Sequence, residues 1–465
     1  MSADADERDA ADIAVLGGGM MGLTAARALV RSGCRVTLYE AAATAGGVSA
    51  ACDLGGFTVD RFYHTVLPSD TALLGLLAEL GLGDEVAWRV TRTGFAQAGR
   101  HHSVSNVMEF LRFPVLTPPE RLRLGWALWR AQHGVDWPDV AHLTCEQWLT
   151  RACGEAVVRK LWRPLLRAKL GAAAPRVSAS FIWATINRLQ DAKQGAGAAR
   201  SDRMGFLRGS YRVLLDALLA DLSRRGARVV TNAAVTGLAP APGGGWRVET
   251  AAGAFTHDTV VSTIPPAVLA RALRDGALGP DTPAARARLA AVEYLGVAVE
   301  VLLLKRPLGP FYILNLGDDD LPLTGVIETT NLAPEGYFGE KSLVYLPRYL
   351  APGDPWAGRD EDEVAAGFHA ALARVHPGFR PELIAARSLQ RAPYVQPIHT
   401  LGYPEEKLPP EELAPGLYCA STAQIHPWPL ANNAVVRQAL AVAEQVARAV
   451  APAGRADHAS GETAS

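Results

Sequence analysis

The hydrophobic pattern at the start of the chain predicts a strand, a helix and a second strand in close succession. Residues 13–16 form a short apolar run that ends at three glycines, and residues 20–32 carry apolar side chains at helical spacing up to Gly33. Residues 35–39 alternate between polar and apolar side chains, and Glu40 follows them. This order indicates a βαβ unit, which implies a parallel sheet.

Further along, the pattern changes character several times. Residues 95–200 are rich in Trp and Arg and mostly helical in pattern, although several prolines interrupt them. Residues 285–400 bring several β-like runs, such as 297–304 and 342–346. The other expected elements are helices over 70–83, 210–224, 361–375 and 433–449, a hairpin over 235–250, and strands over 228–230, 259–263 and 416–420.

Composition narrows the class of protein. The 465 residues are 49% hydrophobic, which is enough for a large core and excludes a disordered chain. Lys and Arg number 46 against 47 Asp and Glu, so the net charge of −1 gives no general attraction for nucleic acid. The N-terminus is polar and acidic, and no apolar run reaches the length of a membrane-spanning helix. The five cysteines are scattered without a C-x-x-C pair, so we expect free thiols in a cytoplasmic protein and no metal site.

The glycines that follow the first strand carry a specific chemistry. Gly17 to Gly22 satisfies the pattern G-x-G-x-x-G between a strand and a helix, and Glu40 stands at the end of the next strand. Gly17 allows a tight turn, Gly19 lets a pyrophosphate approach the backbone, and Gly22 lets helix and strand pack closely. The pyrophosphate would lie at the positive end of the helix, with Glu40 accepting hydrogen bonds from a ribose. The motif therefore predicts a dinucleotide site.

Three segments of the chain together resemble a superfamily of flavoproteins. Six positions after Glu40 stand Gly46 and Gly47, and this Glu-x5-Gly-Gly continuation is similar to the FAD corner of flavin amine oxidases, protoporphyrinogen oxidases, phytoene desaturases and UDP-galactopyranose mutases. Residues 205–263, which contain most of the run DTVVSTIPP, resemble the middle FAD segment of that superfamily. Residues 416–439 resemble its C-terminal flavin motif.

The resemblance implies a fold and a domain organisation. The fold is α/β, with a Rossmann-like, GR2-type FAD-binding domain around a parallel central sheet and a discontinuous α+β substrate domain. The expected division gives 11–95, 205–266 and 410–450 to the FAD-binding domain, 96–204 and 267–409 to the substrate domain, and 1–10 and 451–465 to flexible tails.

The same resemblance implies which residues hold FAD. Two positions depart from the family pattern, since Val48 stands where an Arg is usual and Ser421-Thr422 replaces the usual Gly-Asp or Gly-Glu. The amides of Asn432 to Ala434 would open a helix that points at the flavin pyrimidine, although an asparagine there also suits an N-cap. The implied FAD contacts are Gly17, Gly19, Met20, Met21, Gly22, Glu40, Ala41, Gly46, Gly47, Val48, Val235, Ser421, Thr422, Asn432, Asn433 and Ala434.

Five residues are candidates for the chemistry. His64 follows the second FAD corner and is a candidate base or hydrogen-bond donor, and His426 and Trp428 precede the last helix. Lys169 and Glu328 are charged residues in apolar runs, where each either faces a pocket or forms half of an ion pair. A structural role is the alternative for all five.

Two absences bear on the reaction. Amine oxidases of the superfamily carry a lysine on a strand that LGVAVEV resembles, and Glu300 takes its expected place. The glycines of 195–197 neither follow a strand nor open a clear helix, so no nicotinamide site is expected. We therefore expect oxygen or a quinone as the electron acceptor.

These inferences give one expected function and two alternatives. The expected function is that of an FAD-dependent oxidoreductase (an oxidase, dehydrogenase or desaturase) that transfers a hydride from an apolar or lipid-linked small-molecule substrate to flavin N5. The first alternative is amine oxidation. The second is a non-redox mutase like UDP-galactopyranose mutase, which needs cations to hold the diphosphate of a nucleotide sugar. The candidate cations are Arg163, Arg167, Lys169 and Arg176.

The expected helix over 119–133 carries Leu122, Trp126 and Trp129 on one face among several arginines. Packing of this face against the sheet is the arrangement that we expect. A basic amphipathic helix also suits a membrane surface or the entrance to an apolar cavity. The alternative to a freely cytoplasmic location is therefore peripheral contact with the inner face of the membrane.

Overall fold

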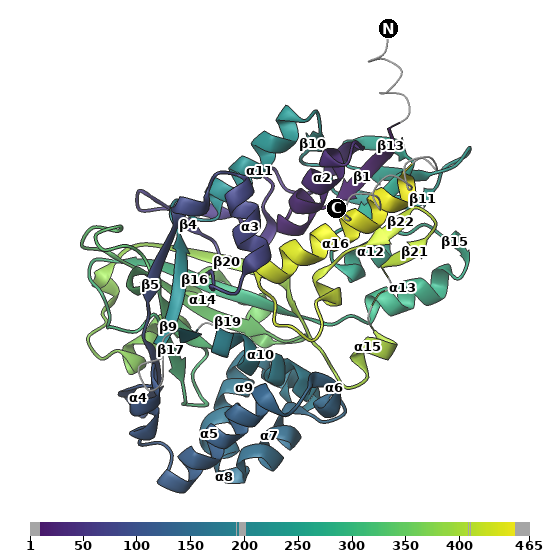
Figure 1. Ribbon diagram of the computed structural model, residues 1–465. Coiled ribbons are helices and arrows are strands. Elements are labelled where there is room, and N and C mark those ends of the chain that lie inside the picture. Colours follow the sequence, from purple (N-terminus) through teal and green to yellow (C-terminus); the bar gives the residue numbers. More distant parts are fainter. Residues whose placement is uncertain (1–9, 192, 195–200, 408, 410, 452–465) are drawn as a thin grey trace, which may run out of the picture.

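The computed structural model of the protein describes residues 10–191, 193–194, 201–407, 409 and 411–451. Apart from their innermost residues, the tails expected for 1–10 and 451–465 lie outside this range. Figure 1 shows α2 (Met20–Arg31) and α16 (Asn432–Val450) side by side, although almost the whole chain separates them. The two ends of the described chain thus contribute to one unit.

A six-stranded sheet is built from three distant segments of the chain. Five of its strands run parallel, and the edge strand β21 is antiparallel to its neighbour. The parallel central sheet expected from the βαβ pattern is therefore confirmed. In sheet order the strands are β10 (Arg228–Val230), β2 (Arg35–Tyr39), β1 (Asp12–Leu16), β14 (Thr259–Ser262), β22 (Leu417–Cys419) and β21 (Glu412–Ala414).

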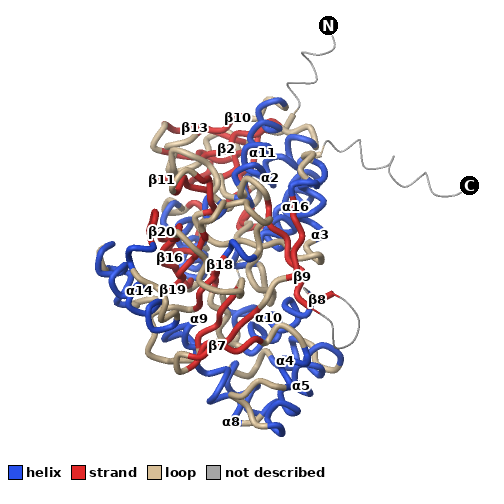
Figure 2. The backbone as a smooth tube through the Cα atoms, turned by 90° about the vertical axis from the view of Figure 1, so that its left-hand side faces the viewer, coloured by secondary structure: helices blue, strands red, loops and turns tan. Residues whose placement is uncertain are grey.

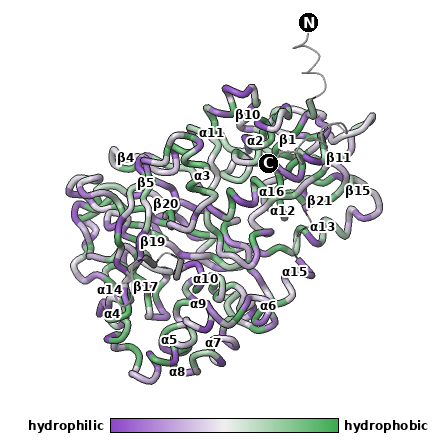
Figure 3. The backbone as a smooth tube through the Cα atoms, in the orientation of Figure 1, coloured by the Kyte–Doolittle hydropathy of each residue, from purple (hydrophilic) through white to green (hydrophobic). Residues whose placement is uncertain are grey.

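Helices cover one face of this parallel sheet, and a small sheet with two helices covers the other. Leu23, Leu38 and Val436 belong to the apolar cluster of the first face, whereas Leu16 and Trp246 belong to that of the second. Hydrophobic and hydrophilic residues alternate along the helices, as expected for elements with one buried face (Figure 3). The first face carries α2, α3 (Thr71–Glu79), α11 (Arg212–Arg224) and α16 (Figure 2), and the second carries β11 (Val235–Pro240), β12 (Trp246–Thr250), β13 (Gly253–His257), α12 (Pro266–Ala272) and α13 (Thr282–Ala290).

A seven-stranded, mostly antiparallel sheet forms the second large layer. Its strand β16 (Tyr294–Leu304) is buried throughout, and its side chains alternate between two apolar clusters. Val297 and Val299 face one cluster, whereas Leu302 faces the other together with α14 (Glu361–Val375), a helix found where it was expected. In sheet order the strands are β20 (Ile384–Pro397), β16, β19 (Ser342–Leu350), β18 (Gly325–Glu328), β17 (Ile313–Leu316), β6 (Thr93–Gln97) and β7 (Arg100–Ser103).

A group of helices between residues 107 and 191 packs around its own apolar cluster, which includes Trp148, Leu166 and Trp183. The mostly helical character expected for 95–200 holds here, although the segment begins with the strands β6 and β7. The helices are α4 (Val107–Leu111), α5 (Pro118–His133), α6 (Trp137–Val140), α7 (Cys145–Cys153), α8 (Glu155–Val157), α9 (Arg163–Leu170) and α10 (Ala179–Asp191). Among the described residues, the remaining strands and α-helix are β3 (Ala51–Leu54), β4 (Phe57–Asp60), β5 (Val86–Val90), β8 (Lys193–Gln194), β9 (Ser201–Leu207), β15 (Ala277–Pro280) and α15 (Tyr403–Glu406).

The face of α5 that was expected to pack against the sheet is exposed instead. Leu122, Trp126 and Trp129 are 69%, 59% and 50% exposed. The buried residues of the helix are Leu124, Ala127 and Ala131. Because small side chains let a helix approach its neighbours closely, α5 packs through this narrower stripe and leaves the larger side chains outside.

The five cysteines are free thiols, and four of them are buried. Burial raises the pKa of the Cys145 thiol to about 12, so it stays protonated and unreactive near pH 7. Within the described residues, we find no helix that combines the length and the apolar character needed to cross a membrane.

A buried arginine fastens the helices that cover the parallel sheet. Arg27, on α2, donates from Nε to Asp221 of α11 and from Nη1 to Glu79 of α3, each over 2.7 Å. Arg224 and Arg225 also donate to Asp221. Burial raises the pKa of Asp221, but the hydrogen bonds from the three arginines outweigh it, so this pKa lies well below its ordinary value.

Replacing this carboxylate tests the network. We expect Asp221→Asn to lower the free energy of unfolding by about 3 kcal/mol at pH 7, because Arg27 stays buried without its full counter-charge. Since the folded pKa of Asp221 is depressed, its contribution is present above the unfolded pKa of about 3.9 and is lost as the pH falls from there towards the folded pKa. Urea denaturation at pH 7 measures the difference in the free energy of unfolding between the wild type and Asp221→Asn. The same measurement at pH 3 should give a smaller difference.

The matched control is Asp320→Asn, which breaks an exposed ion pair with Arg374. Pairs of this kind contribute below about 1 kcal/mol, so this variant should stay close to the wild type. Equal losses in the two variants would contradict the role given to the buried network.

Candidate functional site

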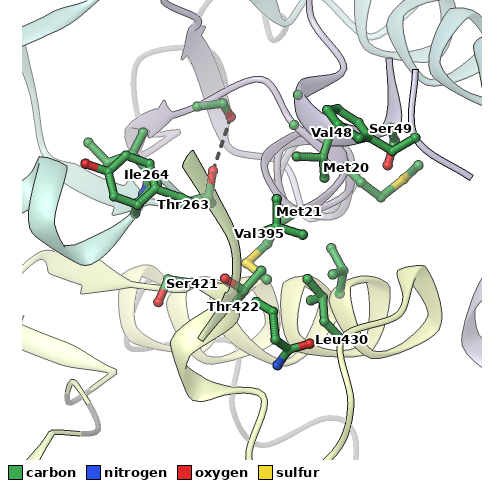
Figure 4. Close-up of a pocket in the computed structure, with 18 of the residues that line it drawn as sticks. Met20, Met21, Val48, Ser49, Thr263, Ile264, Val395, Ser421, Thr422 and Leu430 are labelled. Carbon is green, nitrogen blue, oxygen red and sulfur yellow. Dashed lines mark hydrogen bonds between the residues drawn. The ribbon is translucent and has the colours of Figure 1, made fainter. Parts of the chain in front are cut away.

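A cavity of about 640 Å³ is bordered by the parallel sheet and the seven-stranded sheet. Distant parts of the chain meet on its wall (Figure 4): Met20 and Met21 at the start of α2, Thr263 after β14, and Thr422 and Leu430 before α16. Its size lies within the range of cofactor and ligand sites. One cavity therefore receives all three chain segments that build the parallel sheet.

Parallel strands bring these segments together. Gly17, Glu40 and Thr263 come directly after β1, β2 and β14, and Ser421 comes two residues after β22. Because parallel strands end at the same edge of a sheet, the four loops meet there. The edge where they meet is the edge at which ligands bind in open α/β sheets.

The glycine loop is shaped so that its backbone borders the cavity. Gly17 has a φ of +101°, which favours glycine. A Cβ at Gly22 would overlap the carbonyl oxygen of Gly17, so Gly22 lets α2 pack against the loop. A Cβ at Gly19 would meet no atom within 4 Å, because that position opens on the cavity. Gly46 supports the loop, since its amide donates to the carbonyl oxygen of Gly18 over 2.8 Å.

Two helix N-termini enter this cavity without a side chain that caps them. The N-cap of α2 is Gly19 and that of α16 is Ala431, and neither has a side-chain oxygen to accept a bond from the first-turn amides. Asp360, in contrast, caps α14 with its own side chain. Free amides at the positive ends of helices suit anions. The residues present therefore fit FAD: its diphosphate would suit the N-terminus of α2, and the negative charge that its ring gains on reduction would suit the N-terminus of α16.

Most of the expected FAD contacts line the cavity. Glu40 does so while its carboxylate accepts hydrogen bonds from the amides of Gly18 over 2.6 Å and of Ala42 over 2.8 Å. Thr422 Oγ1 lies 3.1 Å from the hydroxyl of Tyr294. The expected contacts on the wall are Gly17, Gly19, Met20, Met21, Glu40, Ala41, Gly47, Val48, Val235, Ser421, Thr422 and Asn432.

Four expected contacts lie off the wall. Gly22 and Gly46 shape the glycine loop from behind. Ala434 is buried in the apolar cluster below α16. Asn433 accepts a hydrogen bond from the amide of Ala72 over 2.9 Å with its Oδ1, so this side chain holds the start of α3.

Glu328, a candidate catalytic residue, lies outside the cavity. It is buried at the end of β18, where its carboxylate accepts hydrogen bonds from Ser342 Oγ over 2.6 Å and from the amides of Leu308 and Gly309. Burial raises its pKa. The catalytic assignment is corrected to a structural one, because these bonds occupy the carboxylate and hold a loop to the sheet.

His426 and Trp428 are likewise absent from the cavity wall and pack against other rings. His426 stacks on Tyr403, with 25° between the ring planes and 5.7 Å between the centroids. The exposed ring of Trp428 contacts Trp183 of the helical group. The loop that carries both residues turns away from the cavity, and the next residue of the chain that lines the cavity is Leu430.

His64 and Lys169 do line the cavity, and Tyr63 and Tyr349 lie there with them. The hydroxyls of Tyr63 and Tyr349 are 3.2 Å apart, and Lys169 Nζ lies 3.3 Å from the centroid of the Tyr349 ring. We call the part formed by Tyr63, Lys169 and Tyr349 the tyrosine end. Burial lowers the pKa of His64 to about 4, which leaves it neutral near pH 7, and lowers that of Lys169 to about 8.

Sequence reasoning missed the wall that β16 and β19 supply. Val297 and Val299 line the cavity, and so does Tyr349, but on the sequence all three read as core positions of strands. Glu300, which was given the place of the lysine, faces the opposite side of β16 and lies 3.1 Å from His369. The period of two along the strand was the available signal, because it separates Val297 and Val299 from Glu300.

Comparison with known proteins finds a matching family and similar folds. The model of the family described as flavin containing amine oxidoreductase matches residues 20–447. A Mycobacterium tuberculosis protein, AofH, named for flavin-containing monoamine oxidase activity, is 29% identical over 271 residues. That match covers 55% of this chain and 57% of AofH, so it spans little more than half the length of this relative.

Two solved structures share the fold. A protein from Exiguobacterium sp. 255-15, described as a protoporphyrinogen oxidase, aligns with a TM-score of 0.73 and 18% identity over 94% of this chain and 98% of its own. Cyclohexylamine oxidase from Brevibacterium oxydans IH-35A aligns with a TM-score of 0.68 and 16% identity over 94% of this chain and 99% of its own. Both likenesses concern the fold alone.

The open position at Gly19 allows a direct test of the cofactor end. We expect Gly19→Asp to fold but to purify with a flavin content at least about tenfold lower, because a carboxylate would occupy the space for the diphosphate and repel it. The visible absorbance per mole of protein measures the content. The control is Gly378→Asp, at an exposed glycine whose Cβ would also meet no atom within 4 Å. Flavin retained in Gly19→Asp would refute the placement.

Proposed function

The chain belongs to the flavin-containing amine oxidoreductase family of FAD-dependent oxidoreductases. From this premise we propose that it removes a hydride from an apolar or lipid-linked substrate, while a proton leaves the substrate for the solvent. The product gains a C=C, C=O or C=N bond. Bound FAD supplies the hydride acceptor. The observation that carries the proposal is that one cavity runs from the glycine loop at Gly19 to the tyrosine end at Tyr349. Oxygen or a quinone is the final electron acceptor that we propose.

The tyrosine end suits an apolar substrate. Val297, Val299 and Val395 line the cavity and pack in the same cluster as the two tyrosines, so this wall excludes water. Burial raises the pKa of Tyr63 and of Tyr349, so both phenols stay protonated. One of the two hydroxyls is therefore available as a hydrogen-bond donor that orients the substrate, and neither serves as a base near pH 7.

The two alternative reactions differ in their support. Amine oxidation is the second candidate, because AofH is named for it. In addition, His64 is neutral near pH 7, so it is compatible with an uncharged amine in the cavity. A nucleotide-sugar mutase needs several cations at its diphosphate. Arg163, Arg167 and Arg176 each form an ion pair and do not line the cavity, which leaves Lys169 alone among the four candidate cations. This distribution favours a redox reaction.

Anaerobic mixing separates the three reactions. Candidate lipids and apolar alcohols, amines, and nucleotide sugars are each added to the oxidised, flavin-loaded protein while its visible absorbance is followed. We expect the apolar class to bleach the absorbance within the mixing experiment. Bleaching by amines alone would replace the proposal with amine oxidation, and conversion of a nucleotide sugar only after reduction with dithionite would replace it with the mutase. The flavin-depleted Gly19→Asp protein is the blank.

We further propose that the helical group meets a membrane surface at the cytoplasmic side. Exposed apolar side chains gather on α4 and α5, beside arginines that suit anionic lipids. The free thiols support a reducing compartment. The exposed apolar residues are Val107, Met108, Leu111, Leu122, Trp126 and Trp129, and the arginines of these helices and their flanks are Arg112, Arg121, Arg123 and Arg130.

Sedimentation with vesicles tests this surface. Vesicles with an anionic lipid should retain the wild type, and the double variant Trp126→Ser/Trp129→Ser should bind at least about tenfold more weakly, because two rings leave the interface. Leu440→Ser, which changes an exposed leucine on α16, should bind as the wild type does. Equal binding of all three proteins would exclude this surface.

A further inference from the structure

One cation stands without a counter-charge at the tyrosine end. Among the described residues that line the cavity, the charged side chains are Glu40 and Lys169. Glu40 belongs to the loop after β2, where its two oxygens accept bonds from backbone amides. Lys169 comes from α9 and reaches the ring of Tyr349. Within the described part of the chain, no salt bridge joins Lys169 to a carboxylate.

The other basic residues of α9 are paired. Arg163 forms ion pairs with Glu146 and Glu155, and Arg167 pairs with Asp319 at 3.4 Å. Both point away from the cavity, and no arginine is among the described residues on its wall. Lys169 is thus the basic side chain of α9 that is directed at the cavity instead of at a carboxylate of the protein.

An ammonium in such surroundings is costly. Burial disfavours its charged form, and the face of Tyr349 compensates only in part, since a cation–π contact is weaker than pairing with a full negative charge. A ligand that brings a negative charge would supply the missing partner. The apolar wall beside it, at Val297 and Val299, would hold the rest of that ligand.

The tyrosines add a second donor for the same ligand. The hydroxyls of Tyr63 and Tyr349 are 3.2 Å apart, so one donates to the other. Two hydroxyls carry two donors, and this bond uses one of them, which leaves one O–H free. An acid group at the tyrosine end can therefore accept one hydrogen bond from Lys169 and one from a phenol.

We propose that the tyrosine end binds a carboxylate on an otherwise apolar substrate, with Lys169 as the residue that selects it over a protonated amine. This inference rests on the proposed function, because it names the class of substrate for the same cavity. At the tyrosine end, whose members are Tyr63, Lys169 and Tyr349, a protonated amine would meet the like charge of Lys169 and no opposite charge, so it is selected against. The substrate class is then an apolar acid.

Three probes of one length test the selection. Octanoate, 1-octanol and octylamine are titrated into the oxidised, flavin-loaded protein at pH 7, and binding is read from the shift of the flavin absorbance and from calorimetry. Octanoate should bind at least about tenfold more tightly than octanol, as expected for a charge-assisted hydrogen bond. Octylamine should bind most weakly.

Two variants locate the effect. Lys169→Met should weaken octanoate binding at least about tenfold and leave octanol binding within about twofold, because the apolar wall is unchanged. Arg167→Met removes a cation of the same helix outside the cavity and should leave all three affinities unchanged. Lys169→Arg, which keeps the charge, should keep octanoate the preferred probe.

The pH dependence gives an independent readout. Octanoate binding should decline as the pH rises above about 8, where Lys169 loses its proton. Tyr63 and Tyr349 have raised pKa values and His64 has a pKa of about 4, so the other titratable groups at this end do not change charge in that range. Lys169→Met should abolish the decline.

The outcomes separate this inference from the proposed function. Equal octanoate binding by the wild type and Lys169→Met, or octylamine binding as tight as octanoate binding, would overturn the role of Lys169 even if an apolar substrate bleaches the flavin. Selective binding of octanoate that depends on Lys169 would uphold the inference even if no compound class bleaches the flavin, in which case the proposed reaction alone fails.

Discussion

The site depends on one constraint, which is that two helix N-termini without capping side chains share a cavity. The first-turn amides that follow Gly19 in α2 and Ala431 in α16 have no side-chain acceptor of their own. Unpaired buried amides are costly, so this arrangement favours an electron-rich partner between the helices. The parallel strands and the tight glycine loop hold the N-termini of the two helices at the same cavity. The buried bond from Arg27 to Asp221 fastens α2 to α11.

The second sheet imposes a different constraint, because β16 serves a cavity with one face and a structural core with the other. Val297 and Val299 present apolar surface to the substrate side, whereas Glu300 pairs with His369 and Arg387 on the side of α14. A shift of the strand by one residue would exchange the two sets and place a carboxylate in the cavity. The register of β16 therefore keeps a carboxylate out of the cavity and leaves the positive charge of the tyrosine end without a partner.

The features that sequence reasoning found are those with local causes. A positive φ at Gly17 and the lack of space for a Cβ at Gly22 restrict the residue type directly, so the motif is visible in the chain itself. Glu328 and Lys169 looked alike as charges in apolar runs, and only the packing of β18 and α9 places one against a loop and the other at the cavity. The packing of α5 also depends on tertiary contacts. Two stripes of apolar residues were available on this helix, and the stripe with the smaller side chains is the buried one.

The substrate end takes its cation from an element outside the parallel sheet and its covering helices. Proteins with different names share this fold with the chain at 16–18% identity, so the fold by itself does not determine the substrate. The cation of the tyrosine end comes from α9, whereas β16, the strand expected to hold the lysine position, supplies valines. The helical group around α9 has its own apolar cluster, so its sequence can change with little effect on the parallel sheet. Placing the charge there separates the choice of substrate from the binding of the cofactor.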